Sequence, residues 1–280
     1  MTEAEWIAFL QRPEIPAFNR AMLDYPDDDL PRLVFADWMD ENCPDTDVNR
    51  AVRRSVTHPA EREQWVSVQP LGIALSLVRG RNRISLLDET QPAAAVMSLW
   101  RKMWVGAIAF GNVTHNTALR WIQDTGMESV ESVEFLFCES GEQLAALLSS
   151  RSLRSLKSLE LECGRNGAEM IRVLGESEVL PQLTALSLGG FGFQGESLRA
   201  LWRSRRVRGL KALSLRWSSI TAETFESLAT SPNLRGLVQL TFTGTQVGLN
   251  DAATLANSPY LCEAIRAQWR CATDGGGANR

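Results

Sequence analysis

The spacing L-x-x-L-x-L recurs along the second half of the chain and dominates its pattern of hydrophobic and polar positions. Four copies begin at Leu156, Leu183, Leu210 and Leu237, so that the residue number rises by 27 at each step, and a degenerate copy begins at Val130. Apolar residues at alternate positions predict a strand with one buried face. Self-similarity at a fixed period of this length predicts stacked repeats, because a single unit cannot bury its own leucines.

An amphipathic helix is expected after each of these strands, beyond a short loop. The apolar anchors of the helices are predicted to be Leu144 and Leu147, Ile171 and Leu174, Leu198 and Leu201, Phe225 and Leu228, and Ala252 and Leu255. A connector then ends each unit at an apolar residue, namely Leu153, Leu180, Val207, Leu234 or Leu261. The expected fold class is therefore α/β, a solenoid with a parallel sheet on its concave side and helices on its convex side.

Residues 1–64 predict a small helical module ahead of the repeats. Apolar residues at helical spacing occur before and after a break at Pro13 and Pro16. An acidic run, Asp27–Asp29, and the early Pro31 predict a second helix that ends near Asn42. The polar residues 43–64 are compatible with a linker or with a further helix around residues 50–56.

Residues 65–128 are predicted to form an irregular cap and a degenerate repeat, since terminal repeats must cover an open end of the core. Short strands are expected within 78–89 and within 97–110, and a helix over 116–123. The clear repeats occupy residues 129–262, and residues 263–280 are expected to be a C-terminal tail with a disordered, Gly-rich end.

The repeats resemble leucine-rich repeats of the 27–28-residue, helix-containing kind, as in the ribonuclease-inhibitor-like class. The strand phrase and its period agree over four units within residues 129–262. The Asn or Cys that this family places after the strand is replaced here, by Gly164, Phe191, Ser218 and Thr245. The side-chain ladder that this Asn or Cys forms under the loops is therefore not expected in its usual form.

The N-terminal segment resembles the repeat-companion domain that precedes leucine-rich repeats in planctomycete-type bacterial proteins. That domain is marked by an acidic-proline turn followed by R-L-x-[FY]-A-D-W-[LM]-x-E. The chain has Pro26–Pro31 as the turn, then Arg32–Glu41 with the sequence RLVFADWMDE, and a later Arg50-Ala51 pair. The resemblance implies a helical module joined to a repeat array, and it carries no catalytic activity over to this chain.

The charge distribution distinguishes the N-terminal segment from the rest of the chain, and the cysteine content indicates the cellular compartment. The chain has a net charge of −4, and residues 1–64 carry 14 acidic and 7 basic side chains, a net −7. Five scattered cysteines without a C-x-x-C pair favour reduced thiols and a cytoplasmic location. The N-terminus lacks the basic and apolar regions of a signal peptide, and no apolar stretch approaches the ~20 residues of a membrane span.

Few residues have the spacing of a catalytic or metal site. His58 and His115 have no Ser, Cys or acid at motif spacing. The run Asp27–Asp29 lacks the D-x-D-x-D-G spacing of a calcium loop and is better explained by helix capping. Gly189–Gly195 lies between a strand and a helix, as a phosphate-binding loop does, but it lacks G-K-[ST] and each unit has a turn there. We therefore expect no catalytic residue, no cofactor and no metal.

Two charged clusters leave alternatives open. One connector contains Arg203, Arg205, Arg206, Arg208 and, close by, Lys211. A solvated connector is favoured there over an anion-binding or nucleic-acid patch, because no aromatic residues interleave with the cations. In the N-terminal module, Arg32 and Asp37 are expected to pair across the helix while Trp38 anchors the module to the repeats. The alternative is that these three residues form a partner-binding face.

The outward positions of the strands are the candidate recognition surface. Residues between the leucines alternate away from the core and are mostly small or polar. The candidate protein-binding residues are Glu134, Glu160, Glu162, Ser187, Ser214, Arg216, Trp217, Thr241 and Thr243. Arg and Trp are enriched at binding hot spots, although Trp217 is also compatible with packing on a neighbouring turn.

The sequence thus predicts a non-catalytic scaffold that recognises another protein on the concave face of the repeats. The alternative is a regulatory or substrate-docking subunit of an enzyme complex, in which the N-terminal module contacts the enzyme. The partner is an unidentified protein. Neither nucleic acid nor a membrane is expected as a partner.

Overall fold

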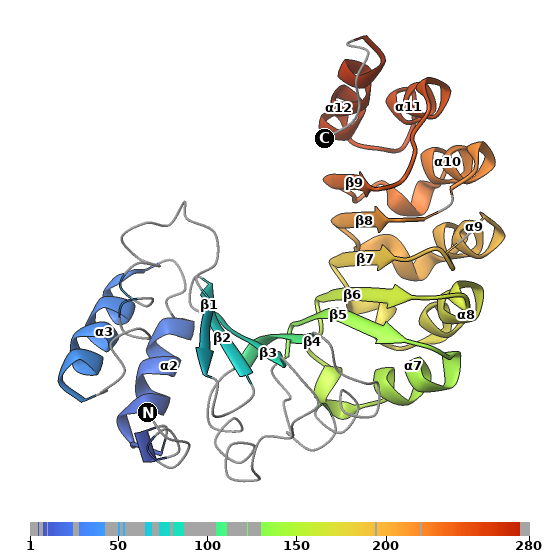
Figure 1. Cartoon of the computed structure of the whole chain (residues 1–280). Coiled ribbons are helices and arrows are strands. Elements are labelled where there is room, and N and C mark those ends of the chain that lie inside the picture. The colour runs from blue at the N-terminus through green and yellow to red at the C-terminus, as the bar shows by residue number, and fades with distance from the viewer. Residues whose placement is uncertain are drawn as a thin grey trace. The chain divides into compact units, whose positions relative to one another are not determined.

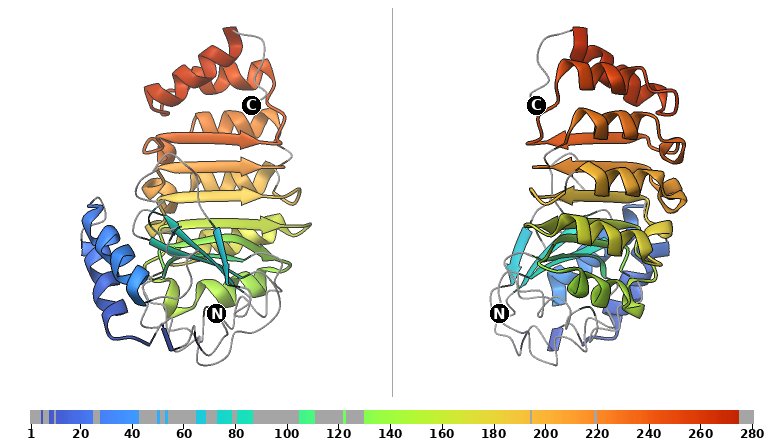
Figure 2. Two further views of the ribbon diagram at one scale, coloured as in Figure 1. Left: turned by 60° about the vertical axis from the view of Figure 1, so that its left-hand side comes forward. Right: turned by 90° about the vertical axis from the view of Figure 1, so that its right-hand side faces the viewer.

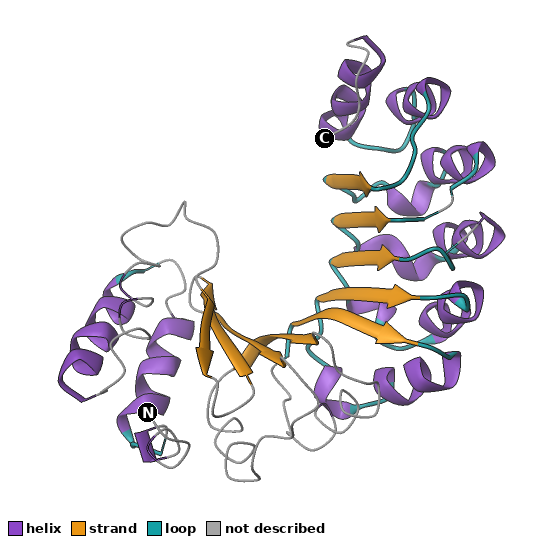
Figure 3. Cartoon of the chain, viewed as in Figure 1, coloured by secondary structure: helices purple, strands orange, loops and turns teal. Residues whose placement is uncertain are grey.

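The chain forms two compact units, Met1–Val133 and Glu134–Arg280. The computed structural model describes residues 5, 8, 9, 11–24, 28–42, 50, 53, 65–68, 73–78, 81–86, 105–110, 122, 130–193, 195–218 and 220–274. Helices and strands occur in both units, and the second unit has α/β architecture with a parallel sheet (Figure 1; Figure 3).

Two helices of the first unit, α2 (Glu14–Asp24) and α3 (Leu30–Asn42), share an aromatic cluster. The ring of Trp38 lies 5.7 Å from that of Phe9 and 5.4 Å from that of Phe18, between ring centroids. The predicted capping of α3 is confirmed, because Asp28 Oδ1 accepts a hydrogen bond of 2.9 Å from the Leu30 N–H. The predicted end of α3 at Asn42 is also confirmed.

The expected pair between Arg32 and Asp37 is wrong. Buried Arg32 contacts Asp29 at 3.2 Å, whereas exposed Asp37 contacts Arg53 at 2.7 Å. Residues five apart point about 140° away from each other around a helix, so the two side chains of α3 leave it on different sides. Trp38 packs within its own module, and its predicted role as an anchor to the repeats stays a prediction.

The strands of the first unit are β1 (Trp65–Val68), β2 (Ile73–Val78), β3 (Arg81–Leu86) and β4 (Val105–Phe110). β1 pairs with β2 and β2 with β3, both antiparallel, whereas β3 and β4 are parallel. The sequence predicted strands at β3 and β4, but it did not predict β1 and β2. The helix expected over 116–123 lies outside the described residues except for Ile122, which is buried.

The sheet of the second unit repeats with the period of the sequence. Its strands are β5 (Ser132–Cys138), β6 (Ser158–Cys163), β7 (Ala185–Gly189), β8 (Ala212–Arg216) and β9 (Gln239–Thr243), in that order. The strands β6 to β9 are parallel, and Ser158, Ala185, Ala212 and Gln239 are successive register partners at the period of the leucine phrase. The sheet is open and places equivalent residues of successive units side by side.

The helices of this unit line one side of the sheet (Figure 1; Figure 2). They are α7 (Gly141–Leu148), α8 (Gly167–Glu176), α9 (Gly195–Arg203), α10 (Ala222–Ala229) and α11 (Leu249–Ala256). Between helix and strand lie the 3₁₀ turns η2 (Arg151–Leu153), η3 (Leu180–Gln182), η4 (Arg205–Gly209) and η5 (Pro232–Leu234). Every predicted helix anchor and connector apolar residue is buried, so these predictions are confirmed.

A serine at each helix-to-connector junction is a second periodic feature, which the sequence analysis did not identify. It recurs at the same period as Ser150, Ser177, Ser204, Ser231 and Ser258. Ser231 Oγ donates to the Trp202 carbonyl of the preceding unit at 2.7 Å and accepts from the Asn233 N–H at 3.3 Å. Ser258 Oγ donates in the same way to the Ala229 carbonyl. These hydroxyls satisfy helix-end carbonyls that the helix itself leaves unpaired.

Replacing Ser231 with alanine is expected to lower the free energy of unfolding by about 1–3 kcal/mol. The buried Trp202 carbonyl loses its shorter hydrogen bond and keeps only the 3.3 Å bond from Asn233 Nδ2, and the Asn233 N–H loses its acceptor. Chemical denaturation monitored by circular dichroism measures the change. Thr230→Ala is the control, because exposed Thr230 bonds within its own helix end, to the Glu226 carbonyl. Equal stability of Ser231→Ala and the wild type would show that the serine row does not join the units.

A terminal helix, α12 (Glu263–Asp274), covers the last unit beside α11 (Figure 1). Its residues Ile265 and Trp269 are 1% and 6% exposed. The Trp269 ring meets Phe242 of β9 at 5.4 Å between centroids, and Phe242 in turn meets Phe225 at 5.2 Å. The expectation of a tail from residue 263 missed this helix, whereas its Gly-rich end, residues 275–280, lies outside the described residues.

Candidate interaction surface

The sheet side opposite the helices is open over β6 to β8 in the second unit, where no described helix of this unit lies (Figure 2). Along β6 and β8 the outward residues alternate with fully buried leucines, as the sequence predicted. A shallow hollow of about 160 Å³ lies over these strands, and its lining includes Glu134, Glu160, Ser187, Ser214 and Thr241. Five of the nine candidate residues therefore line one depression.

Three hydroxyls cross this surface in a single row. Ser187, Ser214 and Thr241 are register partners on β7, β8 and β9. None of the three hydroxyls has a hydrogen-bond partner among the residues that the structure describes. They are half-buried and provide both donors and acceptors to whatever contacts the sheet.

A charge cluster borders the row towards the carboxyl ends of the strands. The Arg216 guanidinium on β8 contacts Glu162 Oε1 at 2.9 Å and also contacts Glu160, both on β6. The intervening β7 residue is Gly189, whose position opposite Arg216 leaves room for the long side chain to cross. A Cβ at Gly189 would lie 3.1 Å from Arg216 Nη2, so a side chain there would press on the bridge.

This bridge changes the electrostatic picture drawn from the sequence. The strand pattern places Glu160 and Glu162 at one end and Arg216 further along, as separate charged features. The structure brings the three together with side-chain exposures of 17%, 39% and 19% for Glu160, Glu162 and Arg216. Opposite charges that satisfy each other contribute little attraction for an outside partner, because a partner must first compete with the internal bridge.

Trp217 occupies a backbone position that the neighbouring units give to glycine. It directly follows β8 and has φ 53°, the only positive φ of a non-glycine residue in the part of the chain that the structure describes. The equivalent residues one unit before and after are Gly190, with φ 114°, and Gly244, with φ 64°. A bulky residue in the left-handed region is strained, since its Cβ crowds the backbone.

The indole of Trp217 packs on the next turn and still remains 53% exposed. A Cβ added to Gly244 would lie 2.3 Å from Trp217 Cε3, so the ring rests directly on that glycine. The predicted packing of Trp217 on a neighbouring turn is therefore confirmed, whereas its contact with a partner stays a prediction. Thr243 ends β9 next to this turn, and its carbonyl accepts a 2.9 Å hydrogen bond from the Trp217 N–H.

Phe191 adds an aromatic residue that the sequence analysis left out of the candidate site. It follows Gly190 in the loop after β7 and is 71% exposed. This loop is joined to the Trp217 loop by a 3.0 Å hydrogen bond from the Gly190 N–H to the Arg216 carbonyl. The signal was present in the sequence, because Phe191 stands in the slot where the resembled repeats place Asn or Cys.

The remaining chemical candidates divide between described and undescribed residues. His58, His115 and Asp27 lie outside the described residues. Asp28 caps α3, and Gly190 provides the turn expected after β7. Among the described residues, no group of three or more His, Cys, Asp or Glu side chains could hold a metal ion, and no helix is long and apolar enough to cross a membrane.

The buried thiols of the second unit are poor nucleophiles at neutral pH. Burial raises the pKa of Cys138 to about 12 and that of Cys163 to about 11, from an ordinary value of 9.0. The thiolate, which is the reactive form, is therefore scarce at both positions.

Comparison with known proteins adds no family assignment. No family model matches the chain, and no curated protein matches it in a sequence search.

Proposed function

We propose that residues 129–262 form a leucine-rich-repeat solenoid, and that the protein is a non-catalytic scaffold that binds another protein on the open face of its sheet. The in-register pairing of residues one period apart supports the solenoid. The observation that carries the binding function is Trp217, strained at φ 53° and half exposed between two units that use glycine.

The energetic cost of the left-handed backbone at Trp217 supports a role of this residue in binding a partner. A strained backbone position costs of order 1–3 kcal/mol, and glycine in the neighbouring units shows that the turn itself requires no side chain. An indole on Gly244 recovers part of that cost by packing, but its exposed half contributes nothing to folding. Tryptophan is the side chain most enriched where binding energy concentrates, so its exposed half fits a contact with a partner.

The rest of the face fits a protein segment better than a small molecule. The hollow over the strands is small and shallow, whereas small-molecule sites are enclosed cavities of about 300–1,000 Å³. The row of Ser187, Ser214 and Thr241 offers hydrogen bonds along the direction of the stack. Trp217 and Phe191 then supply apolar contact at the edge of the same surface.

The first unit gives weaker support to the resemblance between the N-terminal segment and the repeat-companion domain. The helix α3 is capped at Asp28 and packs against Phe9 and Phe18 through Trp38, which agrees with the helical module that the repeat-companion resemblance implies. We propose this relationship and a cytoplasmic location on the sequence pattern and cysteine content already described.

Trp217→Gly is the most informative test of the binding face. The partner would first be captured on the immobilised wild-type chain and identified by mass spectrometry, and its affinity would then be measured by titration. The variant is expected to weaken binding by about 30-fold or more, the loss typical of a hot spot. Its free energy of unfolding should stay within about 1 kcal/mol of wild type, since relief of strain offsets lost packing.

Tyr260→Ala is the matched control for this experiment. Tyr260 is another exposed aromatic residue, 41% exposed, but it lies in the connector after α11. The Tyr260→Ala variant should bind the partner with the affinity of the wild type. Unchanged affinity of a folded Trp217→Gly variant would refute binding at this face.

A further inference from the structure

A row of cations runs along the connectors of the second unit. The connector segments 149–157, 176–184, 203–211 and 230–238 contain nine basic and two acidic residues. Eight of the basic residues are exposed, and together they are called the connector ridge: Arg151, Arg154, Lys157, Arg203, Arg205, Arg208, Lys211 and Arg235. The charged cluster that was predicted from the sequence covers only one connector of this ridge, residues 203–211.

Backbone hydrogen bonds hold successive connectors side by side. The Thr184 N–H donates to the Lys157 carbonyl at 2.7 Å, and the Lys211 N–H donates to the Thr184 carbonyl at 2.7 Å. The next donor in this ladder is the Val238 N–H, which bonds the Lys211 carbonyl at 2.8 Å. Adjacent strands lie about 4.8 Å apart, so cations of the third and fourth connectors are neighbours. The second connector has no basic residue, and Lys157 therefore stands two strand spacings, roughly 10 Å, from Lys211 on the same side of the stack.

The two carboxylates of the connectors do not neutralise the ridge. Glu176 pairs with Arg172 of α8 at 3.0 Å, and Glu178 pairs with Arg206 at 3.6 Å. Neither Arg172 nor Arg206 belongs to the ridge. In the described part of the chain, the side chains of Arg151, Arg154, Arg205 and Lys211 have no carboxylate partner.

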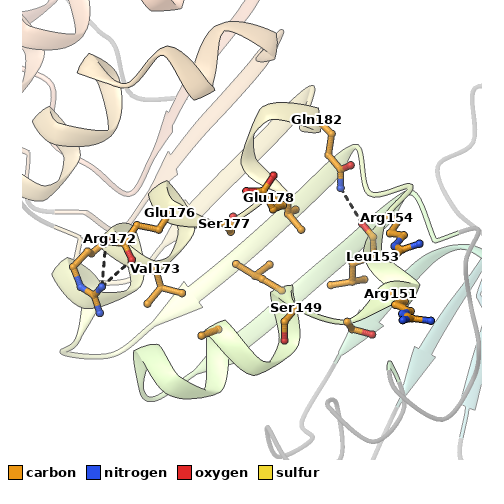
Figure 4. A pocket seen from close by; sticks show the side chains of 14 residues that line it. Ser149, Arg151, Leu153, Arg154, Arg172, Val173, Glu176, Ser177, Glu178 and Gln182 are labelled. Atoms are coloured by element: carbon orange, nitrogen blue, oxygen red, sulfur yellow. Dashed lines mark hydrogen bonds and ion pairs between the residues drawn. The ribbon is translucent and has the colours of Figure 1, made fainter.

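A pocket of about 730 Å³ opens beside the first connector of the ridge (Figure 4). Figure 4 shows Arg151 and Arg154 at the end of this pocket away from the Arg172–Glu176 pair. Leu148, Leu153 and Val179 contribute apolar lining. The recess is also lined by Glu176 and Glu178, which are paired with Arg172 and Arg206. Its apolar lining accepts aliphatic groups, and Arg151 and Arg154 add positive charge at one end.

We infer that the connector ridge binds an acidic polypeptide segment of a partner protein. Charge complementarity favours an anionic occupant. The four connector segments contain no aromatic residue and the connector after α11 adds only one, Tyr260, so the described connectors lack the row of aromatic residues on which single-stranded nucleic acid stacks. Apolar contacts for a peptide come from the recess and from Val238, which is 63% exposed beside Lys211.

The ridge is separate from the sheet face of the proposed function and does not depend on it. Trp217 lies after the carboxyl end of β8, whereas Lys211 immediately precedes its amino end. The two surfaces can therefore be tested independently. Loss of one binding activity would leave the other in place.

The test uses the whole chain of residues 1–280 and a fluorescent 12-residue peptide of alternating Glu and Leu, titrated by anisotropy. The double variant Arg205→Glu, Lys211→Glu is expected to bind about tenfold or more weakly, and added salt should weaken wild-type binding. The control Arg165→Glu, Arg270→Glu changes the net charge equally, with both sites exposed outside the connectors. It should alter affinity less than twofold, as should Trp217→Gly.

Two results would overturn the inference. Equal losses in the ridge variant and the charge-matched control would show only a response to net charge. Tighter binding of a 12-nucleotide single strand than of the peptide, abolished by the same ridge substitutions, would assign the surface to nucleic acid instead. Thermal unfolding of both double variants checks that each is folded before titration.

Discussion

Replacing Trp269 with alanine is expected to lower the free energy of unfolding by about 3–5 kcal/mol, the range for truncating a large buried aromatic residue. Trp269 is 6% exposed on α12 and meets Phe242 of the last strand. Phe242 stands where the preceding units have a strand leucine. Without Trp269, Phe242 would lose the ring that it meets on α12, and the apolar end of β9 would be more exposed to water.

Urea denaturation followed by circular dichroism measures this loss. Gln268→Ala is the control, since Gln268 is the exposed neighbour on the same helix, and its effect should stay within about 0.5 kcal/mol. We also expect exposed apolar surface in the Trp269→Ala protein, detectable as binding of a hydrophobic dye. A loss below about 1 kcal/mol would contradict the assignment of α12 as the closing element.

The repeated part of the fold could be predicted because its signal is local and redundant. Leu159 and Leu186 are buried in the structure for the reason visible in the sequence, namely alternation within a strand. The same period predicted the helix anchors such as Leu174 and Leu201, both buried. Because the same pattern recurs in several units, a residue that departs from it in one unit does not obscure the prediction of strand and helix.

Elements outside the period were harder to predict, because their stability comes from partners distant in sequence. α12 has two large apolar residues, Ile265 and Trp269, at helical spacing, and their burial depends on packing against α11 and, for Trp269, on contact with Phe242. The strands β1 and β2 likewise depend on antiparallel pairing with each other and with β3.

The candidate surface was located by strand register, but its chemistry depends on three-dimensional proximity. Arg216 reaches across β7 because Gly189 has no side chain, a relation spanning 54 residues between Glu162 and Arg216. Comparing the units slot by slot would have found two further features. Trp217 aligns with Gly190 and Gly244, and Ser231 aligns with the other junction serines.

The proposed stacking of units, each supported only by its neighbours, leads to a specific expectation for deletions. Removing residues 185–211 joins Thr184 to Ala212 and deletes one whole period, from β7 through η4. The new junction preserves the register, because Thr184 and Lys211 hold equivalent places in the connector ladder. The Ser231 hydroxyl would then face the Gly175 carbonyl, which stands one period before that of Trp202.

The most direct measurement of the stacked-repeat claim is the thermal unfolding of this deletion beside one of residues 185–198, about half a unit. The account predicts that the full-period deletion unfolds cooperatively, at a lower midpoint than wild type, with helix and strand content retained. The half-period deletion should lack a cooperative transition, since it joins a connector to the middle of α9. A full-period deletion as unfolded as the half-period one would contradict the claim that each unit depends only on its neighbours.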